Sequence, residues 1–92
     1  MKYVMLGKIS SDWATKQKAR FRAASAKAKS LGVGIVSVHY TQGEYDFVAV
    51  VEADDVTNVL AFSLWYAQEG FGRIATMPAF EGATIEAAVK KL

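Results

Sequence analysis

Apolar and polar residues follow two different spacings along the chain, one typical of strands and one typical of helices. The changes from one spacing to the other predict the secondary-structure elements. Residues 2–9 are rich in β-prone side chains and end at a polar Ser-Ser-Asp run that can cap a helix. Over residues 13–31 apolar side chains recur at helical spacing, and Gly32 suits the left-handed residue that closes a helix. The pattern predicts a strand followed by an amphipathic helix.

The helix predicted over residues 13–31 has one apolar stripe and a basic face. The stripe consists of Phe21, Ala24, Ala28 and Leu31. Basic side chains occupy much of the rest: Lys16, Lys18, Arg20, Arg22, Lys27 and Lys29. Such a face is more often solvated than a binding site for RNA or an acidic partner.

Two strand-like runs come next, over residues 33–41 and 45–53. The Gln-Gly-Glu segment between them has the length and composition of a hairpin turn. Asp54 or Asp55 then stands where a second helix needs its N-terminal cap. The chain is therefore expected to continue as a hairpin and a helix over residues 56–70.

The last third of the chain predicts one more strand and a short helix. The strand, over residues 71–80, contains Pro78, the only proline, which suits an edge strand because proline cannot donate a ladder hydrogen bond. An apolar stripe after Ala83 predicts a terminal helix. The order βαββαβ plus a helix predicts an α+β, ferredoxin-like fold. We expect one domain over residues 1–92, with a four-stranded antiparallel sheet and two helices on one face.

The predicted sheet has an apolar centre on both faces. A turn at Gln42-Gly43 pairs Tyr40 with Tyr45 and places His39 opposite Asp46. The face assigned to the helices carries Tyr40, Val38, Val36, Gly34, Tyr45, Phe47, Ala49 and Val51. The open face then carries His39, Ser37, Ile35, Val33, Asp46, Val48, Val50 and Glu52. Because monomers rarely expose so large an apolar patch, we expect a homodimer or a higher homo-oligomer joined through this face.

The second helix is apolar nearly all round, which indicates burial on two sides. Its stripe toward the sheet is expected to be Val56, Val59, Leu60, Ser63, Leu64 and Ala67. Phe62, Trp65 and Tyr66 would then project elsewhere. Packing against the terminal helix or an oligomer contact is a simpler explanation than a ligand pocket with an aromatic wall.

Composition narrows the classes of function. The 11 Lys and Arg residues against 9 Asp and Glu give a net charge of +2, too even for a typical nucleic-acid-binding surface. With no Cys and one His, thiol catalysis is excluded and a zinc site is not expected. No cofactor motif is present, and no segment approaches 18 consecutive apolar residues. We expect a cytoplasmic protein without a cofactor, bound neither to nucleic acid nor to a membrane.

The segment YTQGEYDFVAVVEA, residues 40–53, resembles the signature of the GYD domain family, named for a Gly, a Tyr and an Asp at this turn. The resemblance extends over nearly the whole chain and is most specific at the hairpin. It implies a ferredoxin-like subunit of the dimeric α/β barrel type. It implies no established activity.

His39 and Asp46 are the candidate catalytic residues. A carboxylate within hydrogen-bond reach orients an imidazole and favours its protonated form, as a general base or proton shuttle requires. An ordinary cross-strand ion pair is the simpler alternative. Tyr40, Tyr45 and Trp65 are the candidate ligand-binding residues, although aromatic side chains at such positions more often belong to the core.

Three functions follow from these patterns. The first is a homo-oligomeric module that binds or senses a small apolar or aromatic ligand. The second, by fold analogy, is a cofactor-independent monooxygenase or isomerase of the dimeric α/β barrel type, with His39 as base and Tyr45 or Trp65 shaping the pocket. The third is a structural role in a larger ring.

Overall fold

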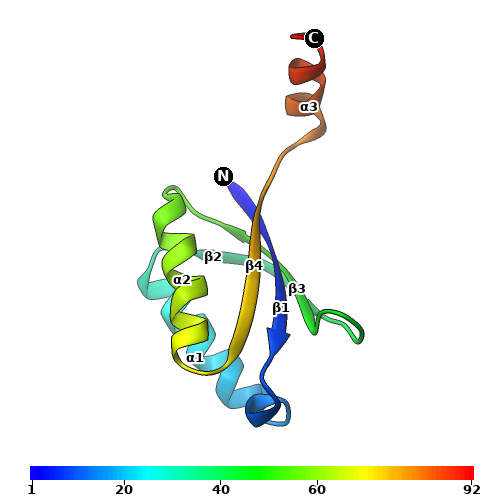
Figure 1. Ribbon diagram of the computed structural model, residues 1–92. Helices are drawn as coiled ribbons and strands as arrows, with labels where there is room; N and C mark the ends of the chain where they lie inside the picture. The colour runs from blue at the N-terminus through cyan, green and yellow to red at the C-terminus, as the bar shows by residue number, and fades with distance from the viewer.

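Four antiparallel strands form one sheet, and two helices cover one of its faces (Figure 1). The computed structural model describes all 92 residues. The elements in chain order are β1 (Lys2–Ile9), α1 (Gln17–Ser30), β2 (Gly34–Tyr40), β3 (Phe47–Glu52), α2 (Val56–Gln68), β4 (Gly72–Ala79) and α3 (Gly82–Val89). The strand order β2-β3-β1-β4 confirms the predicted ferredoxin-like arrangement.

Sequence signals at the element ends act largely as expected. Asp55 caps α2: its Oδ1 accepts hydrogen bonds from the Thr57 amide at 2.9 Å and the Thr57 hydroxyl at 2.8 Å. These hydrogen bonds hold the pKa of Asp55 below its usual value. Pro78 lies in β4, which is an edge strand, so its missing N–H interrupts no ladder inside the sheet.

The first helix begins later than predicted. A 3₁₀ turn at Ser11–Trp13 follows β1, and α1 starts only at Gln17. The side chain of Ser10 accepts a hydrogen bond from the Asp12 amide, so the polar run caps this turn rather than the main helix. Packing explains the delay, because the Trp13 ring meets Phe71 edge-on at 4.4 Å between ring centroids.

The hairpin is confirmed, but the predicted register is wrong. Tyr40 lies opposite Phe47 rather than Tyr45, and the loop is longer because the last backbone hydrogen bond joins the Thr41 amide to the Asp46 carbonyl at 2.8 Å. Val36 then forms a bulge between Ile35 and Ser37. One extra residue breaks the strict alternation of faces, so the side chains before the bulge point to the opposite face from the one predicted by counting back from the turn.

The bulge therefore changes the predicted faces at one end of β2. Ile35 pairs with Val51 on the helix side, and Val33 is buried there, although both were expected on the open face. The register does leave an apolar centre on the open face. It is formed by Val4, Leu6, Val48, Val50, Ala75 and Met77.

The second helix turns a different side to the sheet than predicted. Val59, Phe62 and Tyr66 are buried, whereas Leu60 and Leu64 are exposed. Aromatic side chains bury more apolar area than leucine, and spacings of three and four residues place these three on one face. The aromatic side chains thus form the core, and the leucine stripe faces outward.

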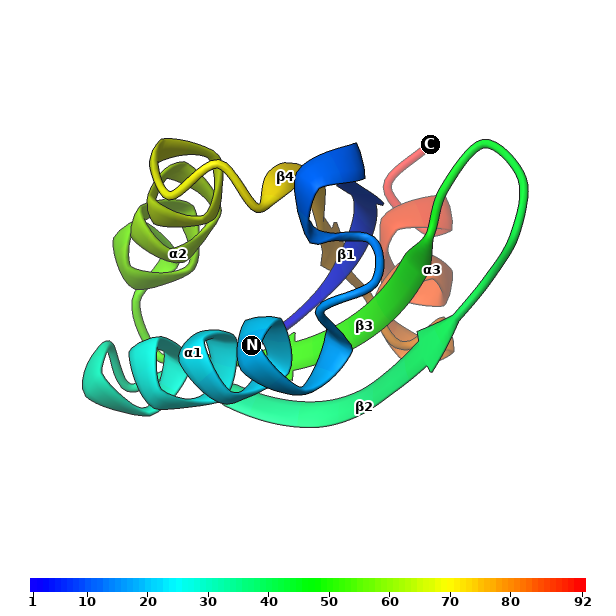
Figure 2. The ribbon, with the colours of Figure 1, turned by 90° about the horizontal axis from the view of Figure 1, so that it is seen from below.

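The two halves of the fold differ in how closely their helices approach the sheet. Figure 2 shows α1 running along β2, while α2 lies on the other side and contacts β4. In the second pairing the Ser63 and Thr76 hydroxyls are 2.8 Å apart. The last helix, α3, stands beyond the end of β4, away from α1 and α2 (Figure 1), and has no buried residue. None of the helices has the length and apolarity of a membrane span.

Candidate functional site

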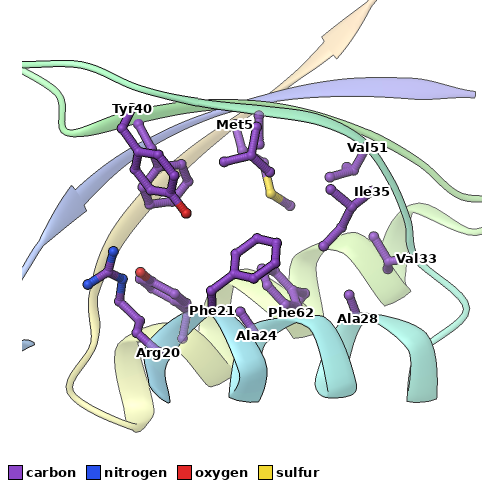
Figure 3. A pocket seen from close by; sticks show the side chains of 14 residues that line it. Met5, Arg20, Phe21, Ala24, Ala28, Val33, Ile35, Tyr40, Val51 and Phe62 are labelled. Atoms are coloured by element: carbon purple, nitrogen blue, oxygen red, sulfur yellow. The ribbon is translucent and has the colours of Figure 1, made fainter. Parts of the chain in front are cut away.

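An apolar cavity lies between the sheet and the two helices (Figure 3). Its volume is about 50 Å³, and 13 of its 14 lining residues are hydrophobic. The sheet contributes Met5, Ile35, Val38, Tyr40, Phe47, Ala49 and Val51, the residue before β2 contributes Val33, and the helices contribute Arg20, Phe21, Ala24, Ala28, Phe62 and Tyr66. The cavity is therefore bounded by β1, β2 and β3 on one side and by α1 and α2 on the other.

Small side chains explain why the space is not filled. α1 presents Ala24 and Ala28 to it, and β3 presents Ala49. The largest apolar side chain of α1 at this place, Phe21, points toward the sheet in Figure 3 and is still 42% exposed. Phe21 therefore stands at the edge of the cavity, between its interior and the solvent.

Arg20 is the only charged residue that lines the cavity, and it is 4% exposed. Its Nη1 donates a hydrogen bond to the Trp13 carbonyl at 2.7 Å, and its Nη2 donates to the side-chain oxygen of Gln17. The Gln17 amide in turn donates to the Tyr40 hydroxyl at 2.6 Å. A chain of polar groups thus closes one end of an otherwise apolar space.

The Tyr66 hydroxyl belongs to the same polar end. Burial raises the pKa of Tyr66 above its usual value. The positive charge of Arg20 and a hydrogen bond from it act in the opposite direction, while the negative charge of Asp46 adds to the increase. Tyr66 therefore stays protonated at neutral pH and can donate a hydrogen bond.

Of the three predicted ligand-binding residues, one lies at the cavity. Tyr40 lines it. Tyr45 lies in the hairpin loop, where the Lys8 ammonium is 5.5 Å from the centre of its ring. Trp65 does not line the cavity and packs against Phe71, at 5.6 Å between ring centroids. For Tyr45 and Trp65, ligand binding stays a prediction.

The structure does not bring His39 and Asp46 together as a cross-strand pair. His39 lies opposite Val48 on the open face of the sheet and is exposed. The Oδ2 of Asp46 accepts a hydrogen bond from the Ile9 amide at 2.6 Å, and the Asp46 amide donates to the Gly7 carbonyl at 2.7 Å. Asp46 therefore fastens the hairpin to the end of β1. The longer loop is the reason that the predicted pairing fails.

Sequence reasoning missed Arg20, Gln17 and Phe21 as site residues. The expected basic face included Arg20, yet Arg20, Ala24 and Ala28 follow one another at intervals of four and share one face of α1. That spacing was a signal that the arginine faces inward. The bond from Gln17 to Tyr40 had no such signal, because it depends on where β2 passes α1.

A second hollow lies where α3 leaves the body. It measures about 380 Å³ and is lined by Met1, Lys2, Glu52, Ala79, Phe80, Glu81 and Thr84. All of these except Ala79 are exposed, so the hollow is an open surface rather than an enclosed site. No group of three or more His, Cys, Asp or Glu side chains is placed to hold a metal ion.

Solved structures with the same fold are distant in sequence. The crystal structure of FFRP-DM1 matches 86% of this chain and 97% of its own, with a TM-score of 0.60 and 18% identity. The 5-chloro-2-hydroxyhydroquinone dehydrochlorinase TftG from Burkholderia phenoliruptrix AC1100, in complex with 2,5-dihydroxybenzoquinone, matches 91% of this chain and 98% of its own. Its TM-score is 0.63 at 14% identity. Identities this low show a common fold alone.

A family model gives the more specific assignment. No protein of curated function matches the chain in sequence. The model of the GYD domain matches residues 3–89, which include nearly all of the sheet, both covering helices and all of α3. The resemblance seen in the hairpin is therefore confirmed, and the chain belongs to the GYD domain family.

Proposed function

We propose that the chain binds a small, mainly apolar ligand between its sheet and its helices, as a module that works as a homo-oligomer. The observation that carries this proposal is the cavity beneath α1, an unfilled apolar space in a fold whose other helix packs closely. Protein interiors are otherwise filled to crystal-like density. Pockets that bind small molecules are typically apolar, with a few converging polar groups, as here.

The size of the cavity limits the ligand. At roughly 10–15 Å³ for each water-sized group, a volume of about 50 Å³ has room for about three to five such groups. Pockets for drug-sized ligands begin at about 300 Å³. A ligand with a ring therefore enters only when Phe21, already 42% exposed, turns outward.

The open face of the sheet supports the proposed assembly. Its centre carries Val4, Leu6, Val48, Val50, Ala75 and Met77 with no helix above them. A second copy packed sheet to sheet covers this patch, in the arrangement that the family resemblance implies. The apolar side chains of α3, including Ile85 and Val89, are also uncovered and available to the same assembly.

An enzymatic function is the second candidate, favoured by the similarity to a dehydrochlorinase that holds a dihydroxybenzoquinone. In this function His39 acts as the base from the open face, at the seam between two subunits, rather than within the cavity. 5-Chloro-2-hydroxyhydroquinone is the first compound to assay for turnover by loss of HCl, and 2,5-dihydroxybenzoquinone is the matching probe for binding alone. Turnover that is lost in His39→Ala supports the enzyme, and unchanged ligand binding without turnover supports the binding module.

Xenon is a probe matched to the size and polarity of the cavity. Ala24→Leu should fill the space from α1, whereas Ala26→Leu places the same side chain on the exposed side of the same helix. Crystals of the wild type and of Ala26→Leu, pressurised with xenon, should contain xenon beside Met5 and Phe62. Crystals of Ala24→Leu should not. Wild-type crystals without xenon at this place would contradict the proposed function.

A further inference from the structure

The cavity carries a positive charge that its protein surroundings do not neutralise directly. Arg20 is 4% exposed, and the groups that accept its hydrogen bonds, the Trp13 carbonyl, the Gln17 side chain and the Tyr66 hydroxyl, are uncharged at neutral pH. Arginine is seldom buried to this extent without an anionic partner, because removing its charge from water costs free energy. Hydrogen bonds to neutral acceptors offset only part of that desolvation cost. These hydrogen bonds occupy at most three of the five N–H groups of the guanidinium.

The nearby acidic group is already engaged. Asp46 is near enough for its charge to influence Tyr66, but its Oδ2 accepts the 2.6 Å hydrogen bond from the Ile9 amide. That bond fixes the carboxylate at the end of β1. None of the hydrogen bonds of Arg20 goes to a carboxylate, so the guanidinium can still pair with an anion from outside the chain.

Two tyrosine hydroxyls, those of Tyr40 and Tyr66, belong to the same end of the cavity. Tyr40 receives the 2.6 Å hydrogen bond from Gln17, which leaves its own O–H free to donate. Figure 3 shows Arg20 and Tyr40 at one end, with Ala28, Val33 and Val51 toward the other. The site thus has a cationic, hydrogen-bonding end and an apolar body.

From this arrangement we propose that the ligand is a small organic acid whose carboxylate is bound by Arg20 and the Tyr40 hydroxyl while its hydrocarbon part fills the cavity. This inference rests on the proposed function and names the chemical class of its ligand. A planar guanidinium binds a carboxylate through two parallel hydrogen bonds. With room for about three to five groups, the cavity suits a chain of three or four carbons behind the carboxylate.

Butyrate and its uncharged analogue butyramide test the role of charge in the wild-type chain by calorimetric titration. Hydrogen bonds to a charged group predict that butyrate binds about tenfold more tightly, or better. Across the series from acetate to butyrate, affinity should increase about threefold to fourfold with each methylene that enters the cavity. Equal affinity for butyrate and butyramide would overturn the inference.

Arg20→Met keeps most of the apolar stem and removes the charge, so it should abolish the preference for butyrate and leave butyramide binding intact. Arg22→Met is the matched control, because Arg22 is on the same helix and exposed, and it should keep the full preference. If Arg20 only fastens the Trp13 segment, Arg20→Met will lose stability but retain the preference, which overturns the inference.

Two further measurements remain decisive if Arg20→Met does not fold. Tyr40 is 50% exposed, so Tyr40→Phe should fold and should weaken butyrate binding several-fold with little effect on butyramide. In the wild type, the Arg20 side-chain N–H resonance should shift with butyrate and not with butyramide. Failure of both results contradicts the anion site. If xenon and butyramide still bind in that case, the proposed function stands, and if no probe binds, the proposed function fails as well.

Discussion

At the scale of single residues, Phe21 and Tyr66 set what the cavity admits and how it responds to pH. Phe21 stands at the edge and is 42% exposed, whereas Tyr66 is 3% exposed at the polar end. The first is free to move outward, because solvent lies on one side of it. The second is held by contacts with Phe47, Phe62 and Phe71.

Phe21→Ala should widen the cavity and admit a ring. We expect phenol to bind this variant about tenfold more tightly than it binds the wild type, a difference of about 1.4 kcal/mol. Phe80→Ala is the matched control, since Phe80 is 57% exposed and does not line the cavity. Phenol titrations followed by NMR measure the difference. Equal affinities in all three proteins would show that Phe21 does not limit the site.

Tyr66 should make the fold sensitive to alkaline pH. Burial raises the pKa of its hydroxyl, so the folded chain keeps a proton that the unfolded chain releases near pH 10. The folded state then binds more protons, and the free energy of unfolding decreases as the pH rises through this range. Urea unfolding at pH 8 and pH 10.5 should show a larger loss for the wild type than for Tyr66→Phe. An identical loss would contradict this origin.

At the scale of elements, the junction of β1 with the hairpin positions the floor of the cavity. Gly7 is buried in β1 opposite Phe47, and a Cβ at Gly7 would overlap the Phe47 ring. The Asp46 amide donates to the Gly7 carbonyl beside this contact. Glycine thus lets the Phe47 ring lie directly on the β1 backbone, where it lines the cavity.

Gly7→Ala should displace the Phe47 ring and destabilise the fold by about 1–3 kcal/mol, as overpacked core substitutions do. Gly82→Ala is the control, because a Cβ at Gly82 meets no atom within 4 Å. Thermal or urea unfolding measures both variants. The explanation fails if the two glycine substitutions have the same effect.

The same elements show how far the sequence alone determines the structure. Apolar periodicity, Asp55 and Pro78 were enough for the element order, the helix cap and the edge strand. The hairpin register was not predictable in this way, because both faces of the sheet are apolar and neither constrains the turn length. In α2, both the leucine stripe and the face with Phe62 and Tyr66 have apolar residues at helical spacing, so spacing alone did not show which face is buried. For α2, the burial of Phe62 and Tyr66 in the core decided which face meets the sheet.

The candidate site was predictable only in part. Tyr40 could be assigned because its position in the strand directs it to the helix side. The pairing of His39 with Asp46 depended on the register and failed with it. Arg20 was assigned to the basic face together with its basic neighbours. Its burial depends on the hydrogen bond to the Trp13 carbonyl, and Trp13 was predicted to lie within the first helix.

At the scale of the whole molecule, two apolar surfaces lack a partner within the chain besides the exposed leucine stripe of α2. One is the open face of the sheet, centred on Val50. The other is α3, which contributes to a longest dimension of 48 Å and has Ile85 and Val89 more than half exposed. The cavity lies on the opposite side of the sheet, so assembly and ligand binding use separate faces.

Val50→Lys should separate the proposed homo-oligomer into monomers, since sheet-to-sheet packing would bury an unpaired charge. Leu64→Lys is the control, because Leu64 is 72% exposed on the outer side of α2. Sedimentation equilibrium measures both against the wild type. A wild-type chain that is a 10.0 kDa monomer at all concentrations would contradict the assembly.

The most direct test of ligand binding in the cavity uses the three methionines as reporters. Met5 lines the cavity, Met77 lies on the open face of the sheet, and Met1 begins the chain. With ¹³C-labelled methionine methyl groups, xenon should shift the Met5 resonance in a saturable manner and leave those of Met1 and Met77 in place. An unchanged Met5 resonance, or a saturable shift of Met77 alone, would contradict a ligand site between the sheet and the helices.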